Sequence, residues 1–479
     1  MRTLGHWIDG REVPLGEAST LDVVNPDNDQ PIARIADADC GSIDSAVLSA
    51  HQAFVNHRDT GPSEREAWLL EAADRLNERQ EEFVEELIDE NGSPITKARR
   101  EVSTSINVLR AAAGACRRTT GDTFPTDVVG RFSLGIRKPL GVVAGILPFN
   151  VPLIKAVKHT AMAIATGNAV VMLPSLAAPL TARRLGSLYS DVGVPDGLCN
   201  VVLGDGRSIG DDLTTHPLVQ MVGFTGSTTT GRRIATHCGR LGKQVTLEMG
   251  GKNPLLILPD ADLSKAIPAA ILGAFLYQGQ ICMSSSRILI HDSIYDDVID
   301  RLVGAASGLP MGDLRDPTTV IGPIIHATQR ERIQQQLDDA VELGAKLLCG
   351  GNWHGNRMEP TLLADTRGDM VIASEETFGP VATIGRFSQL DEAIDDANAT
   401  PFGLSASIFT RDLDAAMQFA RQSTAGMVHV NGGTLQEEAH VPFGGTGDSG
   451  FGREGALVGI EELTQWQWVT MAPSRRSTE

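Results

Sequence analysis

Cys282, in the segment GQICMSSSR at residues 279–287, is a candidate nucleophile. A thiol that does covalent chemistry needs a place for an electrophile, hydrogen-bond donors for the oxyanion that forms on attack, and a base. The flanking residues supply no base, so the supporting groups would have to come from elsewhere in the chain. The alternative is a packed, unreactive thiol, because free cysteine is among the most buried residue types.

Two upstream residues could supply these groups. Asn150, in the segment LPFNVP, follows a predicted strand and is flanked by prolines. This rigid setting suits a side-chain amide donor, although Asn in a turn often bonds only the local backbone. Glu248 ends an apolar segment just before Gly250 and Gly251. It is either a solvated strand end or a partly buried carboxylate, whose raised pKa would suit a general base.

A glycine-rich turn at residues 223–227 joins a predicted strand to a predicted helix. A helix N-terminus capped by Ser227 would offer free backbone N–H groups and the helix dipole to a pyrophosphate. The glycine spacing over residues 226–233 is that of a P-loop, but two arginines replace its Lys-Ser/Thr pair, which excludes this kind of ATP site. A second turn, GDGRSIG at 204–210, is a looser dinucleotide fingerprint. Either turn could also be a plain strand-to-helix connection.

The overall composition is that of a globular protein with large cores, since the 479 residues are 42% hydrophobic and 21% charged. A net charge of −19 argues against nucleic acid or an anionic membrane as a partner. The six cysteines are widely spaced, which excludes CxxC motifs, and no metal site is predicted. The N-terminal segment lacks the apolar core of a secretory signal, so we expect a cytoplasmic protein with reduced thiols.

One long segment without Asp, Glu, Lys or Arg, residues 159–182, raises the question of a membrane span. Gly167, Asn168, Pro174 and Pro179 interrupt it. These residues favour a buried helix, a turn and a strand, so we expect no membrane partner.

Helical and strand patterns alternate along the chain. Residues 63–66, Ser-Glu-Arg-Glu, form a capping-box pattern, and the apolar spacing that follows predicts a helix ending at Gly92. Short apolar segments between helices then predict parallel sheets covered on both faces. The first sheet would contain residues 141–147, 168–173, 199–203, 218–224 and 243–249, and the second residues 253–258, 286–291, 382–387, 405–410 and 426–431. Residues 464–471, TQWQWVTM, alternate as an edge or inter-subunit strand would.

Six motifs occur along the chain in one order: PFN at 148–150, GFTGSTTTG at 223–231, LEMGGKNP at 247–254, GQICMSSSR at 279–287, EETFGPV at 375–381 and PFGG at 442–445. With these motifs the chain resembles the NAD(P)-dependent aldehyde dehydrogenase superfamily over essentially its whole length. Residues 429–445 also look like the version found in benzaldehyde-, vanillin- and salicylaldehyde-type members. The resemblance favours a nucleophilic Cys282 over a packed thiol.

The resemblance implies an α/β, aldehyde-dehydrogenase-like fold with two Rossmann-like α/β domains plus a small β oligomerisation segment. The NAD(P)-binding domain would comprise residues 1–116 and 139–250, and the catalytic domain residues 251–450. The oligomerisation segment would combine residues 117–138 with residues 451–479. Its C-terminal strand would pair across subunits, giving a homodimer or a homotetramer.

The resemblance also implies a mechanism for a small-molecule aldehyde. The Cys282 thiolate would attack the aldehyde carbon, and the Asn150 amide and the Cys282 backbone N–H would hold the resulting alkoxide. Loss of hydride to the nicotinamide would give a thioester. Glu248 would then deprotonate the water that hydrolyses the thioester. Glu454 matches a residue assigned to proton relay in the family, with a surface ion pair as the alternative.

The cofactor would contact residues from several of these motifs. Ser227 would meet the pyrophosphate, Glu376 the nicotinamide ribose hydroxyls, and Phe378 the ribose and ring. The full predicted set is Leu147, Pro148, Phe149, Gly206, Arg207, Phe224, Thr225, Gly226, Ser227, Glu376 and Phe378.

The chain departs from the family pattern at the adenosine ribose. Leu173 and Leu176 occupy the places of a lysine and a glutamate that normally bind this ribose, and the glutamate normally repels a 2′-phosphate. Arg207 could offer a cation to a 2′-phosphate, or it could simply face solvent. We expect NAD, with NADP as the alternative.

On the substrate side, Lys155, Lys158 and His159 share one face of a predicted helix. They form either a solvated helix face or the border of a substrate tunnel. As tunnel residues, Lys155 and Lys158 would favour an aldehyde with a polar or acidic group. We expect an aromatic or hydroxyaromatic aldehyde, with an acidic semialdehyde as the alternative.

Three other functions fit parts of the sequence. A CoA-acylating enzyme would commonly lack the equivalent of Glu248. A cysteine esterase would leave the nucleotide motifs without a purpose. A non-catalytic nucleotide-binding homologue would be compatible with the two leucines at 173 and 176.

Overall fold

The computed structural model describes residues 1–15 and 19–472. Within them, the first large sheet has eight strands in the order β24-β12-β11-β8-β9-β10-β2-β3. The strands are β24 (Gly450–Phe451), β12 (Gln244–Glu248), β11 (Val219–Thr225), β8 (Val142–Ile146), β9 (Ala169–Leu173), β10 (Cys199–Val201), β2 (His6–Ile8) and β3 (Arg11–Val13). From β12 to β10 neighbouring strands are parallel, whereas β24 and β2 join antiparallel at the two sides. All five strands predicted for this sheet are confirmed.

Helices cover this sheet, and its central strands are therefore buried on both faces. They are α1 (Cys40–His57), α2 (Pro62–Glu78), α3 (Gln80–Asn91), α4 (Ile95–Ala115), α5 (Pro152–Thr166), α6 (Leu180–Asp191), α7 (Gly206–Thr215) and α8 (Thr228–Leu241). The chain leaves β8 through α5 to reach β9 on one side, and β11 later pairs on the other side of β8. The β8–β11 boundary is therefore a topological switch point, where ligands bind in open α/β sheets.

The second large sheet, again among the described residues, has seven strands in the order β15-β18-β19-β14-β13-β21-β22. They are β15 (Lys346–Cys349), β18 (Thr361–Ala364), β19 (Val381–Phe387), β14 (Arg287–His291), β13 (Pro254–Ile257), β21 (Ser405–Phe409) and β22 (Met427–Val430). The helices beside it are α9 (Leu263–Phe275), α10 (Tyr295–Ser307), α11 (Ala327–Glu342), α13 (Leu390–Asn398) and α14 (Leu413–Gln422). The five predicted strands are confirmed, and β15 and β18 were not predicted.

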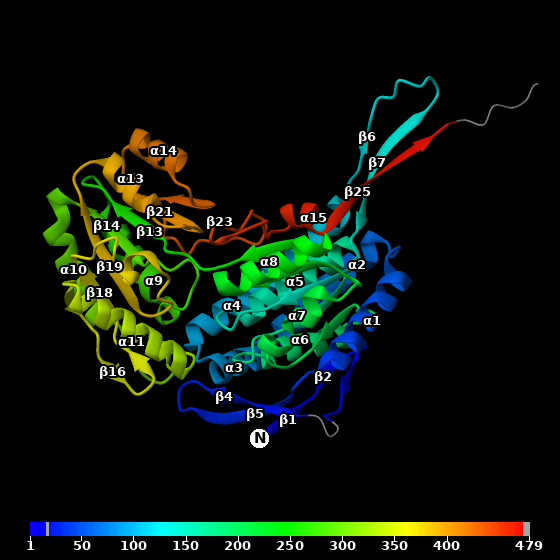
Figure 1. Ribbon diagram of the computed structural model, residues 1–479, viewed down its shortest axis with the longest axis horizontal. Coiled ribbons are helices and arrows are strands. Elements are labelled where there is room, and N and C mark those ends of the chain that lie inside the picture. The colour runs from blue at the N-terminus through cyan, green and yellow to red at the C-terminus, as the bar shows by residue number, and fades with distance from the viewer. Residues whose placement is uncertain (16–18, 473–479) are drawn as a thin grey trace, which may run out of the picture.

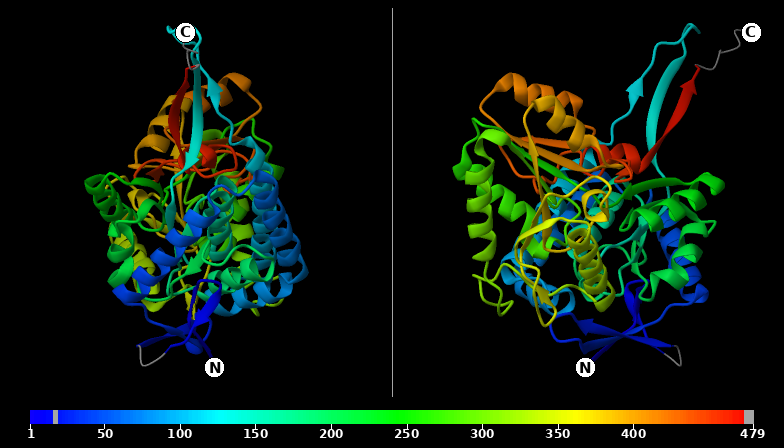
Figure 2. Two further views of the ribbon diagram at one scale, coloured as in Figure 1. Left: turned by 90° about the vertical axis from the view of Figure 1, so that its right-hand side faces the viewer. Right: turned by 60° about the vertical axis from the view of Figure 1, so that its left-hand side comes forward.

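A three-stranded arm projects away from the two sheets (Figures 1 and 2). It combines β6 (Asp122–Thr123), β7 (Phe132–Pro139) and β25 (Thr464–Met471), and β25 pairs antiparallel with β7 along its whole length. The predicted strand at 464–471 is confirmed. At the opposite end lies a small sheet of β1 (Arg2–Leu4), β5 (Gln30–Ala36) and β4 (Thr20–Asn25).

The fold is therefore the predicted α/β class. The assignment of residues 1–116 with 139–250, 251–450, and 117–138 with 451–479 to three domains stays a prediction. Residues 16–18 of the first range and 473–479 of the last lie outside the described residues.

The predicted helix from the capping box to Gly92 is two helices, and the capping box is wrong. Helix α2 begins at Pro62 after Gly61, without a side-chain cap among the described residues, and Glu66 instead bonds Arg117. A break at Arg79, with φ −102° and ψ 19°, separates α2 from α3. The predicted end is correct, because Gly92 terminates α3 in the left-handed conformation that glycine favours.

The segment 159–182 forms the end of α5, a turn and all of β9, as predicted, and then continues into the start of α6, which was not predicted. These residues are mostly buried within the protein. No helix in the described ranges is long and apolar enough to cross a membrane.

Candidate active site

A cavity of about 300 Å³ opens where the carboxyl ends of β8, β11 and β12 face the loop before β14. Cys282, Glu248 and Asn150 all line this cavity, although they come from distant parts of the sequence. The cavity lies at the switch point of the first sheet. The fold therefore brings together the three residues that the sequence proposed for chemistry.

Cys282 lies in the loop between α9 and β14, with its sulfur 3.8 Å from Oε2 of Glu248. The side-chain amide of Asn253 donates to the carbonyl oxygens of Cys282 at 2.8 Å and Ser284 at 2.9 Å, which fixes the loop. Burial raises the pKa of the Cys282 thiol well above its usual value, Glu248 raises it further, and Lys155 lowers it. The resting thiol is therefore protonated and directed at Glu248.

Glu248 is the last residue of β12 and is almost fully buried. Burial raises the pKa of its carboxyl, and the Lys155 ammonium, 3.3 Å from Oε2, partly offsets this. The other oxygen, Oε1, has no hydrogen-bond partner in the described chain. The interpretation as a solvated strand end is thus wrong, and the buried-carboxylate interpretation is confirmed.

Asn150 is buried, and its side-chain amide donates to the carbonyl of Gln280 at 3.1 Å. This partner lies 130 residues further along the chain, so the amide does not serve a local turn. The contact places the amide nitrogen beside the loop that carries Cys282. Lys97 donates to the backbone carbonyl of Asn150 at 2.6 Å from behind.

The predicted cofactor residues fall in two neighbouring hollows. The active-site cavity is lined by Leu147, Pro148, Phe149, Phe224, Thr225, Gly226, Ser227, Glu376 and Phe378. Gly206 and Arg207 line an adjacent groove of about 570 Å³, which Leu147 and Phe149 share. All eleven residues therefore lie along one continuous path from the thiol outward.

Local geometry in this path suits a dinucleotide. Ser227 caps helix α8, and its side-chain oxygen accepts from the N–H of Thr230, as predicted. Oε1 of Glu376 accepts from the N–H of Gly251 at 3.1 Å, and burial raises the pKa of Glu376 to about 7. The buried hydroxyl of Thr225 has no partner among the described residues, which leaves it for a bound molecule. These groups fit NAD(P).

The adjacent groove holds the two leucines that depart from the family pattern. Leu173 is buried, and Leu176 packs against the same core. Arg207, whose side chain is exposed, and Arg233 also line the groove. Arg233 pairs with Asp211 at 3.3 Å. The groove therefore has an apolar wall and two cations near the expected ribose.

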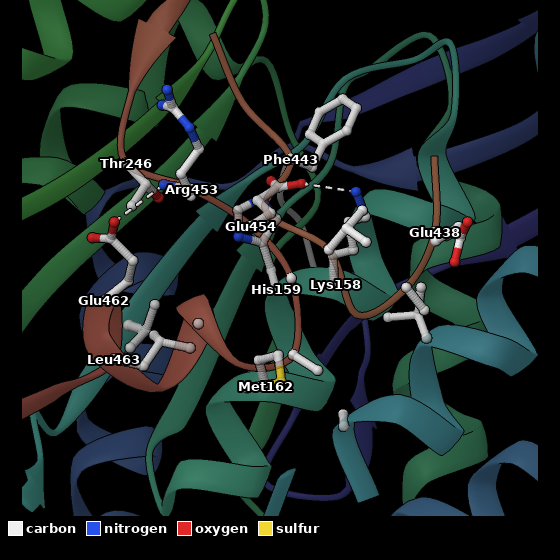
Figure 3. A pocket seen from close by; sticks show the side chains of 18 of the residues that line it. Lys158, His159, Met162, Thr246, Glu438, Phe443, Arg453, Glu454, Glu462 and Leu463 are labelled. Atoms are coloured by element: carbon white, nitrogen blue, oxygen red, sulfur yellow. Dashed lines mark hydrogen bonds and ion pairs between the residues drawn. The ribbon is translucent and has the colours of Figure 1, made fainter. Parts of the chain in front are cut away.

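Lys155 and Lys158 form a buried charge cluster with Glu248, Glu437 and Glu454. The Nζ of Lys155 lies 2.8 Å from Oε2 of Glu454 and 3.3 Å from Oε2 of Glu248. Lys158 pairs with Glu437. Its Nζ also lies 3.1 Å from Oε2 of Glu454 (Figure 3). The two lysine side chains are only 3% and 8% exposed.

The interpretation of this helix face as solvated is therefore wrong. The face packs against the segment around Phe443, whose ring lies 5.0 Å from Lys155 Nζ and 4.1 Å from Lys158 Nζ. Burial also lowers the pKa of His159 to about 4. Glu454 belongs to this cluster, so it is not a surface ion pair.

We expect replacement of Lys155 by Met to shift the pH dependence of any reaction that uses Glu248 and Cys282. Lys155 lowers the pKa of both Glu248 and Cys282. Its removal raises both, so less of each group is deprotonated near neutral pH. The acid limb of the kcat/KM profile should move up by about one pH unit or more.

The matched control is Lys158→Met, which removes a lysine from the same cluster without a direct contact to Glu248. Its shift should be clearly smaller. An acid limb that stays in place in Lys155→Met would show that Lys155 does not tune these groups.

A doubly wound sheet whose switch point opens into a nucleotide-sized path, with a thiol in the same cavity, is the architecture of a nucleotide-dependent oxidoreductase. Residues 15–469 match the model of the Aldehyde dehydrogenase family, and the chain belongs to that family. It is an NAD(P)-dependent oxidoreductase that oxidises a small-molecule aldehyde to a carboxylic acid.

Known proteins are similar over almost the entire chain. Vanillin dehydrogenase of Pseudomonas fluorescens is 39% identical over 467 residues, which is 97% of each chain. Benzaldehyde dehydrogenase [NAD(+)] of Pseudomonas putida is 37% identical over 468 residues, covering 97% of this chain and 95% of the relative. The crystal structure of a salicylaldehyde dehydrogenase from Pseudomonas putida G7, complexed with salicylaldehyde, has a TM-score of 0.96, 34% identity and 99% coverage of both chains. The family and fold predictions are confirmed.

Proposed function

We propose that this enzyme oxidises an aromatic or hydroxyaromatic aldehyde, with Cys282 as nucleophile, Asn150 as oxyanion donor and Glu248 as general base. The observation that carries the proposal is the 3.8 Å contact between the Cys282 thiol and the Glu248 carboxylate, in a cavity that the Asn150 amide also lines. A thiol beside a base and an amide donor is the arrangement that covalent catalysis needs.

The chemistry follows from these contacts. The Cys282 thiol loses its proton to solvent water, and its sulfur forms a bond to the aldehyde carbon. The second N–H of the Asn150 amide and the Cys282 N–H stabilise the alkoxide. Bound NAD(P) supplies the hydride acceptor, and Ser227 and Glu376 would hold its pyrophosphate and ribose. Glu248 then removes a proton from the water that attacks the acyl carbon, and the Cys282 thiolate leaves as the carboxylic acid forms.

The charge cluster favours an uncharged substrate over an acidic semialdehyde. Two lysines face three carboxylates, so the formal charge is 2 − 3 = −1 when all are ionised. Neither lysine retains a free positive charge for a substrate carboxylate, and a further anion would meet net repulsion. A neutral aromatic ring with a hydroxyl group avoids this cost. The vanillin-, benzaldehyde- and salicylaldehyde-oxidising relatives are consistent with this choice.

NAD is the proposed cofactor, with NADP accepted less well. Leu176 puts an apolar side chain where the family has the glutamate that repels a 2′-phosphate, so discrimination should be weak. Arg207 and Arg233 line the groove, and their positive charge is compatible with a bound 2′-phosphate. The benzaldehyde relative, whose name specifies NAD(+), supports NAD as the first choice.

We also propose a cytoplasmic homodimer or homotetramer. Strand β25 on the arm exposes Trp466 and Trp468, at 49% and 71%, and this apolar edge would be covered by a second copy. Light scattering of the purified protein would measure the assembly state.

The substrate proposal is tested with benzaldehyde, vanillin, salicylaldehyde, hexanal and succinic semialdehyde, each with NAD and with NADP. We expect kcat/KM for the best aromatic aldehyde to exceed that for succinic semialdehyde by about 100-fold, since one unpaired charge in a buried site costs at least 2–3 kcal/mol. Absorbance of the reduced nicotinamide follows each reaction.

Product analysis in the same assay separates the rival functions. Free carboxylic acid formed without CoA excludes a CoA-acylating enzyme. Ester hydrolysis without any nicotinamide-dependent reaction would instead favour an esterase. A kcat/KM for hexanal or succinic semialdehyde far above that for every benzaldehyde would contradict the substrate proposal.

A further inference from the structure

Behind the Asn150 loop lies a buried polar cluster that the proposed chemistry does not use. It comprises Ser93, Lys97, Glu101 and Tyr277, and each of these side chains is at least about nine-tenths buried. The Nζ of Lys97 donates to Glu101 Oε2 at 2.6 Å and to Ser93 Oγ at 3.0 Å. The same ammonium lies 4.1 Å from the centre of the Tyr277 ring.

Lys97 makes its third hydrogen bond to the active-site loop itself. It donates to the backbone carbonyl of Asn150 at 2.6 Å. Asn91, just ahead of Ser93, donates to the preceding carbonyl, that of Phe149, at 3.0 Å. Two consecutive carbonyls of the loop are therefore held from one side. The Lys97 bond is charge-assisted, and such bonds are short and strong. Together the two bonds fix the backbone that carries the Asn150 amide.

Glu101 holds the other end of the same loop. Its Oε1 accepts from the N–H groups of Leu153 at 2.9 Å and Ile154 at 3.4 Å, in the first turn of α5. The N-cap residue of α5 is Val151, and its side chain makes no capping hydrogen bond to the described residues. A carboxylate at this position satisfies the free N–H groups and the helix dipole. The Lys97–Glu101 pair thus spans the loop from Asn150 to α5.

Tyr277 connects the cluster to the loop that carries the nucleophile. Its hydroxyl donates to the carbonyl of Asn91 at 2.6 Å, and its backbone has φ 49°, an uncommon value for a residue with a side chain. Gln280, three residues later, supplies the carbonyl that accepts from the Asn150 amide. The cluster is therefore bonded to both sides of the Asn150–Gln280 contact.

We propose that the Lys97–Glu101 pair is a positioning device for the Asn150 amide, holding it at the site of the developing oxyanion. The inference rests on the proposed role of Asn150 as oxyanion donor. Neither Lys97 nor Glu101 lines the cavity, so both act through the backbone of the loop. Burying an ion pair stabilises a fold little, because desolvation offsets the attraction. Its role here is the orientation of a donor.

The test is a double-mutant cycle between Lys97→Met and Asn150→Ala, read by the rate of reduced-nicotinamide formation in a single turnover. Lys97→Met alone should slow this burst about 10- to 100-fold, the cost of a misplaced reacting group. In the Asn150→Ala background the same change should slow it by less than about threefold, because the amide to be positioned is gone. The Kd of NAD, measured by calorimetry, should stay within about twofold of the unchanged protein.

Two further variants separate positioning from general stability. Lys97→Arg, which retains the charge and the donors, should recover part of the burst rate. Arg184→Met breaks the ion pair of Arg184 with Glu86, between α6 and α3, and should lower the unfolding temperature without slowing the burst. If Lys97→Met does not fold, Glu101→Gln goes through the same cycle. Gln keeps an acceptor for α5 but removes the anionic partner of Lys97.

The outcomes distinguish the positioning role of the Lys97–Glu101 pair from the role of Asn150 as oxyanion donor. Equal slowing by Lys97→Met in both backgrounds would overturn the positioning role while leaving Asn150 as the donor. An Asn150→Ala enzyme with an unchanged burst would instead overturn the proposed role of Asn150, and the positioning role with it.

Discussion

Cys282→Ser should lower kcat/KM by at least about three orders of magnitude, with reduced nicotinamide formation falling to background. A serine hydroxyl is much harder to deprotonate than a thiol and is a weaker nucleophile. The Cys282 thiol, 3.8 Å from Glu248, is the only thiol among the described residues that line the cavity. Initial rates with the best aldehyde and saturating NAD measure the loss.

The matched control is Cys349→Ser, because Cys349 is a partly buried free thiol like Cys282 but lies in β15, away from the cavity. Its kcat/KM should stay within about twofold of the starting enzyme. Calorimetry should show that Cys282→Ser still binds NAD, since the cofactor path is intact. A Cys282→Ser enzyme that kept a tenth or more of its activity would rule out Cys282 as the nucleophile.

Glu248→Gln should separate the two halves of the reaction. We expect one rapid burst of reduced nicotinamide per active site, followed by a steady-state rate about 10²- to 10⁴-fold below that of the unchanged enzyme. The amide of Gln cannot take a proton from water, so the acyl group stays on Cys282. Stopped-flow absorbance measures both phases, and mass spectrometry of the quenched protein should detect the acyl adduct.

Added hydroxylamine needs no general base, so it should restore turnover in Glu248→Gln. Glu438→Gln, which changes an exposed carboxylate outside this cavity, should behave like the unchanged enzyme. A Glu248→Gln enzyme with an unchanged steady-state rate would contradict the assignment of the base. Loss of the burst as well would mean that Glu248 is needed to activate the thiol.

The ten strands named from the sequence for the two large sheets were predictable because their patterns are local. Segments such as 168–173 are buried on both faces and are bounded by turn residues, so a short apolar run suffices to identify them. The capping box at 63–66 failed because Pro62 starts the helix first, and because Arg117, distant in sequence, takes Glu66 as its partner. Local rules cannot anticipate a competing tertiary contact.

The catalytic candidates could be named from the sequence, but only the resemblance favoured a nucleophilic Cys282 over a packed thiol, since nothing near Cys282 identifies a base. The charge cluster was not accessible at all. Lys155 was correctly placed on a helix, yet its partner Glu454 lies 299 residues away. The pair Lys97 and Glu101 carries an i, i+4 signal, but this spacing is far more common on solvated helix faces. Only the fold shows that both pairs are buried, and burial is what distinguishes them from ordinary ion pairs on a solvated helix face.

The crossing between the two sheets has a consequence for recombination. Glu248 ends β12 in the first sheet and Pro254 begins β13 in the second, so only residues 249–253 connect them. Hydrogen bonds hold this connection in place on both sides. The N–H of Gly251 donates to the Glu376 carboxylate, and the side-chain amide of Asn253 donates to the carbonyl of Cys282. The base belongs to one sheet and the nucleophile to the loop that feeds the other. A chimera of two relatives joined within 249–253 would therefore pair a base from one parent with a thiol from the other, and crossover points that preserve this chemistry lie outside the interval from Glu248 to Cys282.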